Sequence, residues 1–318
     1  MSNLEIRRLG EVEQSVATRG TVCLHFHPDR TDNQGLSVLD SILEHGLYRS
    51  QFETGLSAGS VSAWPGGYRY DWETDLFGGA YDMAAAEERP KYGALNLFRP
   101  PDGPAPRFGS CYLELKPEVT ARCTFTYLDS YTQPSQRGTL EVFDDILAAL
   151  FTECFERNYA LGLSIIKVAD LCEHILQPSS SLPLRSLDHY IEAQVHGPIQ
   201  LDRDVDRVVA DTSYRNTPWE AKLESLCERY QCRLLWHGGF KLGVDKVPLD
   251  FRGPQMPVIA SQVAGDSPVV NAYLLGQAAA LPENAKSHDR LQLMKRLWHV
   301  LVKFGEWEGL YSTVRYSP

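Results

Sequence analysis

The sequence lacks the complete motifs, in their structural context, of the commonest nucleotide-binding and hydrolase folds. It contains no Walker loop and no G-x-G-x-x-G after a predicted strand, which argues against a P-loop and a Rossmann dinucleotide site. It also contains no H-E-x-x-H, the signature of many zinc proteases. A G-x-S-x-G string occurs once, as GLSAG at 55–59, in a stretch without a sustained period and not between a predicted strand and a predicted helix, where the elbow of an α/β hydrolase lies. Any catalytic chemistry must therefore come from residues outside these motifs.

Paired cysteines and long apolar runs are missing as well. The seven cysteines are scattered and include no C-x-x-C pair, which argues against a disulfide framework and a zinc site. No run reaches 18 apolar residues and the N-terminus has no apolar h-region, so we expect neither a membrane span nor a signal peptide. These absences favour a soluble protein of the reducing cytoplasm.

The charge and composition indicate a globular chain. The net charge of −10 argues against a broad electrostatic grip on nucleic-acid phosphates. A chain of 318 residues, 43% of them hydrophobic, is long enough for one large domain or two ordinary ones with an ample core.

Both strand-like and helix-like periodicities occur, which predicts an α+β fold. Strands are predicted at 21–26, 108–115, 120–127, 190–197, 205–210 and 232–236, and helices at 35–45, 139–162, 165–176, 219–230 and 289–304. Gly46 is a predicted helix C-cap, and Thr217-Pro218 a predicted N-cap followed by proline at the first helical position.

The stretch YIEAQVHG at 190–197 combines a strand pattern with a central carboxylate. Its alternation places Tyr190, Glu192 and Gln194 on one face and the apolar residues on the other. A carboxylate on such a face is either solvated or placed for chemistry.

Two further segments are candidates for a site. His25 and His27 lie two residues apart near a strand end, so they face the same side, and Asp29 and Arg30 follow. Residues 48–72 are rich in glycine, serine and aromatic residues without a sustained period, which predicts a binding loop or lid.

Several stretches, taken in chain order, resemble the His–Tyr–Glu branch of the ADP-ribosyltransferase superfamily, which includes the poly(ADP-ribose) polymerases and diphtheria toxin. The histidine strand of that branch is similar to LHFHPDR at 24–30, and its glycine-ended helix is similar to ILEHGL at 42–47. Its tyrosine phrase is similar to FGGAY at 77–81, and its glutamate strand to YIEAQVHG. The phrases HFHPDR, RSQFETG, RPKYGALN and YIEAQVHG also resemble those of a bacterial family known mainly as a domain of unknown function.

The resemblance implies three parts of the chain. An ADP-ribosyltransferase-like catalytic domain would cover 21–240, after an N-terminal lead-in at 1–20 and before a mostly helical C-terminal extension at 241–318. The implied fold is α+β, with split mixed or antiparallel sheets and flanking helices.

The implied reaction is NAD-dependent cleavage of the nicotinamide–ribose bond, with transfer of ADP-ribose to water or to an unknown acceptor, which could be a protein, a nucleic acid or a small molecule. Glu192 would stabilise the oxocarbenium-like transition state, and His27 would orient a ribose hydroxyl. No metal is implied. The other residues expected to bind NAD are His25, Arg30, Arg49, Ser50, Gln51, Phe77, Gly78, Tyr81 and Tyr92.

Within that set, Tyr81, or alternatively Tyr92, would stack on the nicotinamide ring, and Arg30 or Arg49 would pair with the pyrophosphate. One position departs from the polymerase pattern, in which a glycine follows the histidine and donates its backbone amide to nicotinamide. Pro28 follows His27 and has no N–H. Either His25 takes the matching position, or nicotinamide is held differently, or the substrate is not NAD.

Two other hypotheses remain open from the sequence. A non-enzymatic module could bind a ligand or partner through the aromatic loop at 48–72. A glycosidase-type hydrolase could pair Glu192 with Glu53 or Asp75.

Overall fold

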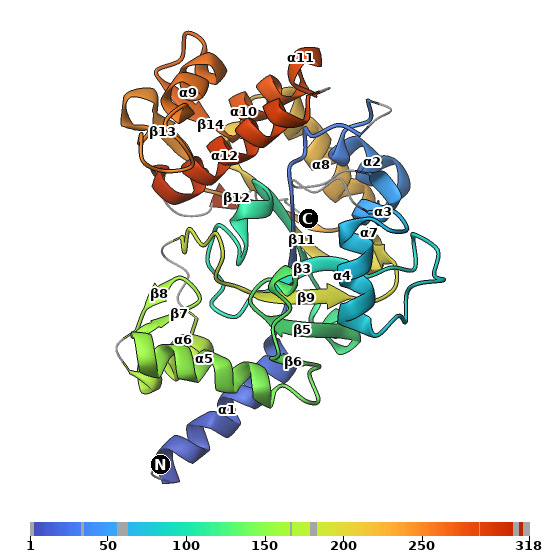
Figure 1. Cartoon of the computed structure of the whole chain (residues 1–318), viewed down its shortest axis with the longest axis vertical. Coiled ribbons are helices and arrows are strands. Elements are labelled where there is room, and N and C mark those ends of the chain that lie inside the picture. The colour runs from blue at the N-terminus through green and yellow to red at the C-terminus, as the bar shows by residue number, and fades with distance from the viewer. Residues whose placement is uncertain are drawn as a thin grey trace.

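A nine-stranded sheet runs through the middle of the molecule (Figure 1). The computed structural model describes residues 3–32, 35–55, 63–165, 167–178, 183–285, 287–307 and 312–313. The strand order is β15-β12-β11-β4-β1-β3-β9-β5-β6, and of these neighbours only β11 and β12 are parallel. The structure is therefore α+β with a large mixed sheet, and these strands form one sheet where a split pair was expected.

The strands of this sheet are β1 (Val22–Phe26), β3 (Lys91–Leu95), β4 (Cys111–Leu115), β5 (Cys123–Tyr127), β6 (Arg137–Gly138), β9 (Ile191–Val195), β11 (Val205–Asp211), β12 (Arg233–His237) and β15 (Ser312–Thr313). Three small antiparallel pairs join β2 (Leu47–Tyr48) to β10 (Ile199–Gln200), β7 (Tyr159–Ala160) to β8 (Leu163–Ser164), and β13 (Lys241–Gly243) to β14 (Val269–Asn271).

The α-helices are α1 (Asn3–Arg19), α2 (Val38–His45), α3 (Gln51–Thr54), α4 (Tyr68–Phe77), α5 (Asp144–Arg157), α6 (Val168–Leu176), α7 (Leu201–Asp204), α8 (Pro218–Tyr230), α9 (Met256–Ala264), α10 (Ala272–Ala280), α11 (Pro282–Ala285) and α12 (His288–Phe304). Short 3-10 turns are η1 (Pro106–Phe108), η2 (Pro117–Arg122), η3 (Ser130–Thr132), η4 (Thr212–Tyr214) and η5 (Val244–Lys246). Among the described residues, no helix is both long enough and apolar enough to cross a bilayer.

The predicted helix ends are confirmed by their geometry. Gly46 ends α2 with φ 66°, a left-handed conformation that glycine adopts without strain, and a Cβ there would lie 2.7 Å from the ring of Tyr230. Thr217 caps α8 by accepting a hydrogen bond from the amide of Trp219, with Pro218 at the first helical position.

The segment at 48–72 is more regular than the sequence pattern predicts. It contains α3 and the start of α4, while residues 56–62 lie outside the described part of the chain. The helix α4 buries only Trp72 and Glu73. Because α4 buries only these two residues, its sequence shows little of the apolar periodicity that predicts a helix.

The strand pairing separates two faces of the sheet. Cys23 pairs with Ala94, and Ala94 pairs with Glu192, so these three side chains point to the same side. The period of two then adds His25, Tyr92 and Gln194 to this side. The opposite side carries Leu24, Leu95 and Ala193. All five residues of β9 are buried, so the predicted half-buried strand is covered on both faces.

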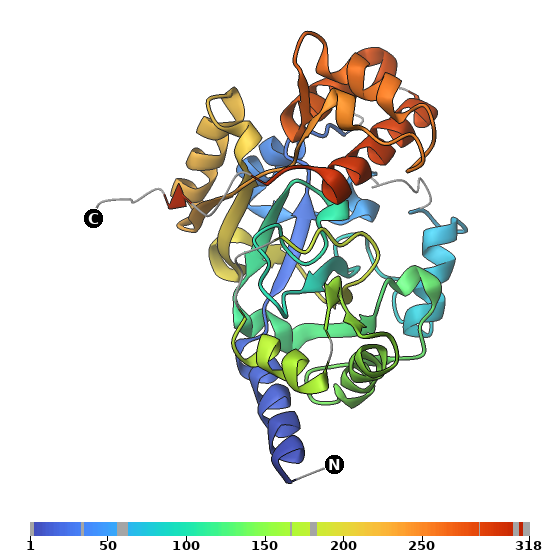
Figure 2. The same ribbon diagram turned by 90° about the vertical axis from the view of Figure 1, so that its left-hand side faces the viewer.

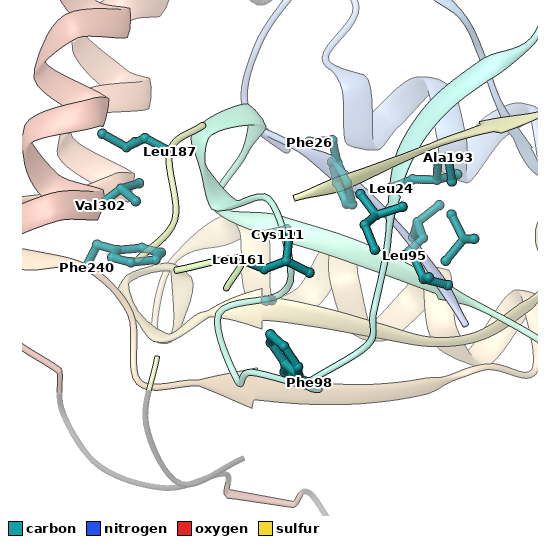
Figure 3. Packing of buried hydrophobic residues seen from close by; sticks show 14 of the residues in the cluster. Leu24, Phe26, Leu95, Phe98, Cys111, Leu161, Leu187, Ala193, Phe240 and Val302 are labelled. Atoms are coloured by element: carbon teal, nitrogen blue, oxygen red, sulfur yellow. The ribbon is translucent and has the colours of Figure 1, made fainter. Parts of the chain in front are cut away.

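The apolar side belongs to one large core that extends to the C-terminal helices. Figure 3 shows part of it, from Leu24 and Leu95 in the sheet to Phe240 and to Val302 on α12. In both views α9 to α12 lie at one end of the molecule and α1 at the other (Figures 1 and 2). The described part of 241–318 is mostly helical, and it shares its core with the sheet.

Candidate functional site

A cavity of about 580 Å³ is lined by residues of the sheet side that carries His25 and Glu192. This volume falls within the range of small-molecule sites, roughly 300–1,000 Å³. The lining comes from β1, α2, α3, α4, β3, η1, the 129–131 turn, β9 and α12. Eight residues expected to bind NAD or act in catalysis lie on its wall: His25, His27, Arg30, Arg49, Ser50, Gln51, Tyr92 and Glu192.

Glu192 is held by one side chain of the turn η3 and by one side chain of its own strand, β9. Its Oε1 accepts hydrogen bonds from the Ser130 hydroxyl and from the Gln194 amide, the latter at 2.9 Å. Its Oε2 has no hydrogen-bond partner among the described residues. Burial, reinforced by the nearby Asp129 carboxylate, raises the pKa of Glu192 to about 7. Glu192 is thus a fixed carboxylate with one oxygen left for a ligand.

The two histidines have different surroundings. The ring of His25 is used on both sides by the backbone: Nδ1 lies 3.1 Å from the Gly109 carbonyl, and Nε2 accepts from the Ala105 amide at 3.3 Å. His27 lies 3.4 Å from the Ser110 hydroxyl through Nδ1, and its Nε2 has no partner among the described residues. His27 is therefore the histidine whose ring retains a nitrogen for a ligand.

Both histidines are neutral at physiological pH. Burial lowers the pKa of His25 to about 3, and burial together with the Arg30 guanidinium lowers the pKa of His27 to about 3. A neutral ring can donate from one nitrogen and accept at the other. By strand geometry the Cα atoms of His25 and Glu192 are two strands and two residues apart, roughly 12 Å.

An aromatic group lies beside Glu192. Tyr92 donates its hydroxyl hydrogen to Glu73 at 2.8 Å, and its ring centroid is 5.5 Å from that of Trp72. The guanidinium of Arg69 lies 4.5 Å from the Tyr92 centroid and 4.8 Å from that of Trp72. Arg69 thus already covers part of the aromatic surface that a ligand ring would use.

Ser50 and Gln51 form the start of α3. Ser50 makes a capping box with Glu53, whose carboxylate accepts from the Ser50 amide at 2.6 Å and pairs with Lys91 at 3.5 Å. Asp75 is exposed and accepts from Gln133 at 3.2 Å. Neither Glu53 nor Asp75 is among the described residues that line the cavity, so the lining gives no support for pairing either with Glu192.

Three predicted residues, Phe77, Gly78 and Tyr81, do not line the cavity. Tyr81 instead begins a chain of hydrogen bonds that ends on Glu192. The chain runs from the Tyr81 hydroxyl to His196 Nδ1 (2.5 Å), from His196 Nε2 to Thr124 (3.0 Å), from Thr124 to Gln194 Oε1 (2.9 Å), and from Gln194 to Glu192 (2.9 Å). Read in this direction, each group donates toward the carboxylate, which favours its ionised form.

Sequence reasoning missed Asp129 and Lys295, which line the cavity, and it placed Arg69 and Trp72 only within the predicted binding segment 48–72, without assigning them a role. Each lies on an element whose position relative to β9 depends on tertiary packing. Asp129 had a local signal, because it is the polar residue directly before a turn, and its side chain caps that turn through the Tyr131 amide. No local pattern distinguishes Lys295 from the other basic residues of its helix.

Comparison with protein families gives one result. A family model described as a protein of unknown function, DUF3626, matches residues 21–304, a range that covers the cavity residues and the whole of α12. No curated protein matches the chain. Within the described residues, no three His, Cys, Asp or Glu side chains come together as a metal-binding group.

Proposed function

The chain belongs to this family of unknown function, and we propose that it is an NAD-dependent ADP-ribosyltransferase or NAD glycohydrolase with an ADP-ribosyltransferase-like fold. One observation carries the proposal: Glu192, His27 and Tyr92, the last of which is the alternative to Tyr81 in the sequence resemblance, come from three distant segments and line one cavity. Glu192 is 5% exposed and has one carboxylate oxygen without a partner among the described residues. NAD is the substrate in this proposal.

The proposed role of Glu192 is electrostatic. As the bond between ribose C1′ and the nicotinamide nitrogen breaks, the bonding electrons leave with nicotinamide and positive charge develops on the ribose. A fixed carboxylate stabilises this charge more in the transition state than in the ground state, because it needs no reorientation. The oxygen of water or of an acceptor then bonds to C1′ and its proton passes to solvent. His27 Nε2 would accept or donate a hydrogen bond to a ribose hydroxyl.

Glu192→Gln tests the proposal against a matched control. Glu114 is a second carboxylate on the sheet with the same 5% exposure, and it lies outside the set of described residues that line the cavity. After incubation with NAD, we expect free nicotinamide from the native protein and from Glu114→Gln, and a loss of about 10³-fold in Glu192→Gln. Equal release from Glu192→Gln and the native protein would remove Glu192 from this role.

A second candidate is a binding module that uses the same cavity without catalysis. The position of Arg69 against Tyr92 and Trp72 favours it, because the guanidinium covers ring surface on which the nicotinamide of NAD would stack. This candidate places the ligand on a surface formed by α3 and α4 instead of a loop. It predicts no nicotinamide release from the native protein, and a Glu192→Gln variant that binds NAD as the native protein does.

A further inference from the structure

Three cations from distant parts of the chain meet in the cavity wall. Arg30 follows β1, Arg107 lies in η1, and Lys295 lies in α12. Neither the guanidinium of Arg30 nor the ammonium of Lys295 has a hydrogen-bond or ion-pair partner among the described residues. Arg107 pairs at 2.5 Å with Asp188, whose side chain is 59% exposed, and at 3.9 Å with Asp129, so three cations face two carboxylates. This part of the cavity therefore has more positive than negative charge.

The nearby titratable groups cancel only part of this charge. Asp29 is buried beside Arg30, accepts a hydrogen bond from Tyr214 at 3.1 Å, and has a pKa raised to about 7 by burial. His299, one turn after Lys295, is buried, and burial with the neighbouring Arg252 and Arg107 lowers its pKa to about 3. Burial and the guanidinium groups of Arg107 and Arg30 lower the pKa of Lys295 to about 8. The three cations repel one another, and of the three only Arg107 has an ion-pair partner among the described residues.

The helix α12 is fixed to the rest of the cavity wall. The indole N–H of Trp298 donates to the Pro106 carbonyl at 2.9 Å, and its ring packs edge-on against His27 with centroids 4.9 Å apart. Lys295 precedes Trp298 by three residues, so both lie on the same side of the helix. These contacts hold Lys295 beside the turn that carries Arg107.

We infer that Arg30, Arg107 and Lys295 form a phosphate subsite, and that α12 is part of the substrate-binding site. Phosphate oxygens suit this group because guanidinium binds them in a bidentate manner and ammonium binds them as a compact charge. This inference rests on the proposed function, since the diphosphate of NAD presents the phosphate oxygens that the three cations would bind. A phosphate group on a second substrate presents the same oxygens.

Binding of inorganic pyrophosphate tests the subsite without NAD. Isothermal titration calorimetry would compare the native protein with Lys295→Met and Lys303→Met, since Lys303 is an exposed lysine on the same helix. We expect Lys295→Met to weaken pyrophosphate binding at least tenfold, Lys303→Met to stay within twofold, and Lys295→Arg to retain binding. No binding by the native protein at millimolar pyrophosphate, or equal binding by Lys295→Met, would overturn the inference.

Two further measurements separate this subsite from the proposed reaction. Glu192→Gln should lose nicotinamide release and still bind pyrophosphate, so the reaction and the subsite can fail independently. Displacement of pyrophosphate by NAD would assign the subsite to the NAD diphosphate, and simultaneous binding would assign it to a phosphate on a second substrate. Both outcomes support the subsite. Loss of pyrophosphate binding in Lys303→Met but not in Lys295→Met would contradict it.

Discussion

The two sides of strands β1, β3 and β9 are both buried but carry opposite chemistry. One side presents Leu24, Leu95 and Ala193, each at most 2% exposed, to the main core. The other presents Tyr92 and Glu192 to the cavity. Burying hydrocarbon is favourable, whereas burying a carboxylate is unfavourable unless partners compensate. The apolar side therefore stabilises the sheet, whereas the polar side lowers its stability and, under the proposed function, serves binding or chemistry.

The largest effect on stability is expected on the apolar side. Leu24→Ala should lower the free energy of unfolding by about 2–5 kcal/mol, because it leaves a cavity in a fully buried position. The matched control is Leu249→Ala, at a leucine that is 67% exposed, which should change the free energy by less than about 0.5 kcal/mol. Urea unfolding at pH 7 measures both. A similar small change in the two variants would contradict the assignment of this side to the core.

On the polar side, a substitution of Glu192 should raise the free energy of unfolding, whereas Leu24→Ala lowers it. Because the folded state raises the pKa of Glu192 from 4.5 to about 7, ionisation of this group disfavours folding as pH rises through that interval. Glu192→Gln removes this penalty, so it should raise the free energy of unfolding at pH 8 by about 1–3 kcal/mol. The gain over the native protein should shrink as pH falls from 7 to 4.5.

The control for this comparison is Glu114→Gln. Glu114 pairs with Arg207 at 3.1 Å and accepts from Thr21 at 3.0 Å, so its removal should not stabilise the protein. Urea unfolding at pH 5 and pH 8 separates the two carboxylates. If Glu192→Gln were less stable than the native protein at pH 8, the polar side would contribute to stability and the contrast between the two sides would fail.

The sequence predicted more of the apolar side than of the polar side. Period-two and helical patterns located β1, β9, α2, α8 and α12, because each buries a continuous face in the core. The resemblance named Glu192 and His27, yet it could not choose between Tyr81 and Tyr92. That choice depends on the β3–β9 register, which pairs Tyr92 with Gln194, a contact between residues about 100 positions apart.

The rest of the cavity also depends on contacts between residues far apart in the sequence, so the sequence alone did not predict it. Arg69 and Trp72 lie within the predicted binding segment 48–72, but the helix α4 that carries them was not predicted because it is weakly amphipathic. Lys295 lies at the cavity because Trp298 anchors α12 on Pro106. The expected split sheet rested on the superfamily resemblance, whereas continuous pairing from β12 through β1 to β5 joins the strands into one sheet.

The hydrogen bond from Ser130 to Glu192 should influence the pH at which nicotinamide release begins. Nicotinamide release that requires ionised Glu192 should rise with pH, reach half its maximum near pH 7 and level off above it. Ser130→Ala removes a donor to the carboxylate and should move this midpoint upward by about 1 pH unit. Thr132→Ala, which removes a hydroxyl bonded to the Asp129 carbonyl in the same turn, should leave the midpoint in place. A midpoint that does not move in Ser130→Ala would show that another group controls the profile.

The smallest effect is expected at Tyr81, which separates the two tyrosines that the sequence could not rank. Its hydroxyl is four hydrogen bonds from Glu192, so Tyr81→Phe should change kcat/KM for NAD by less than about threefold, since polarisation weakens with each step. Tyr92 lines the cavity directly, so Tyr92→Ala should raise KM at least tenfold through loss of ring contact. The reverse ranking, with Tyr81→Ala raising KM and Tyr92→Ala leaving it unchanged, would mean that Tyr81 leaves His196 and enters the cavity when the ligand binds. The polar side would then be completed by the ligand, and its chemistry would not be set by strand register alone.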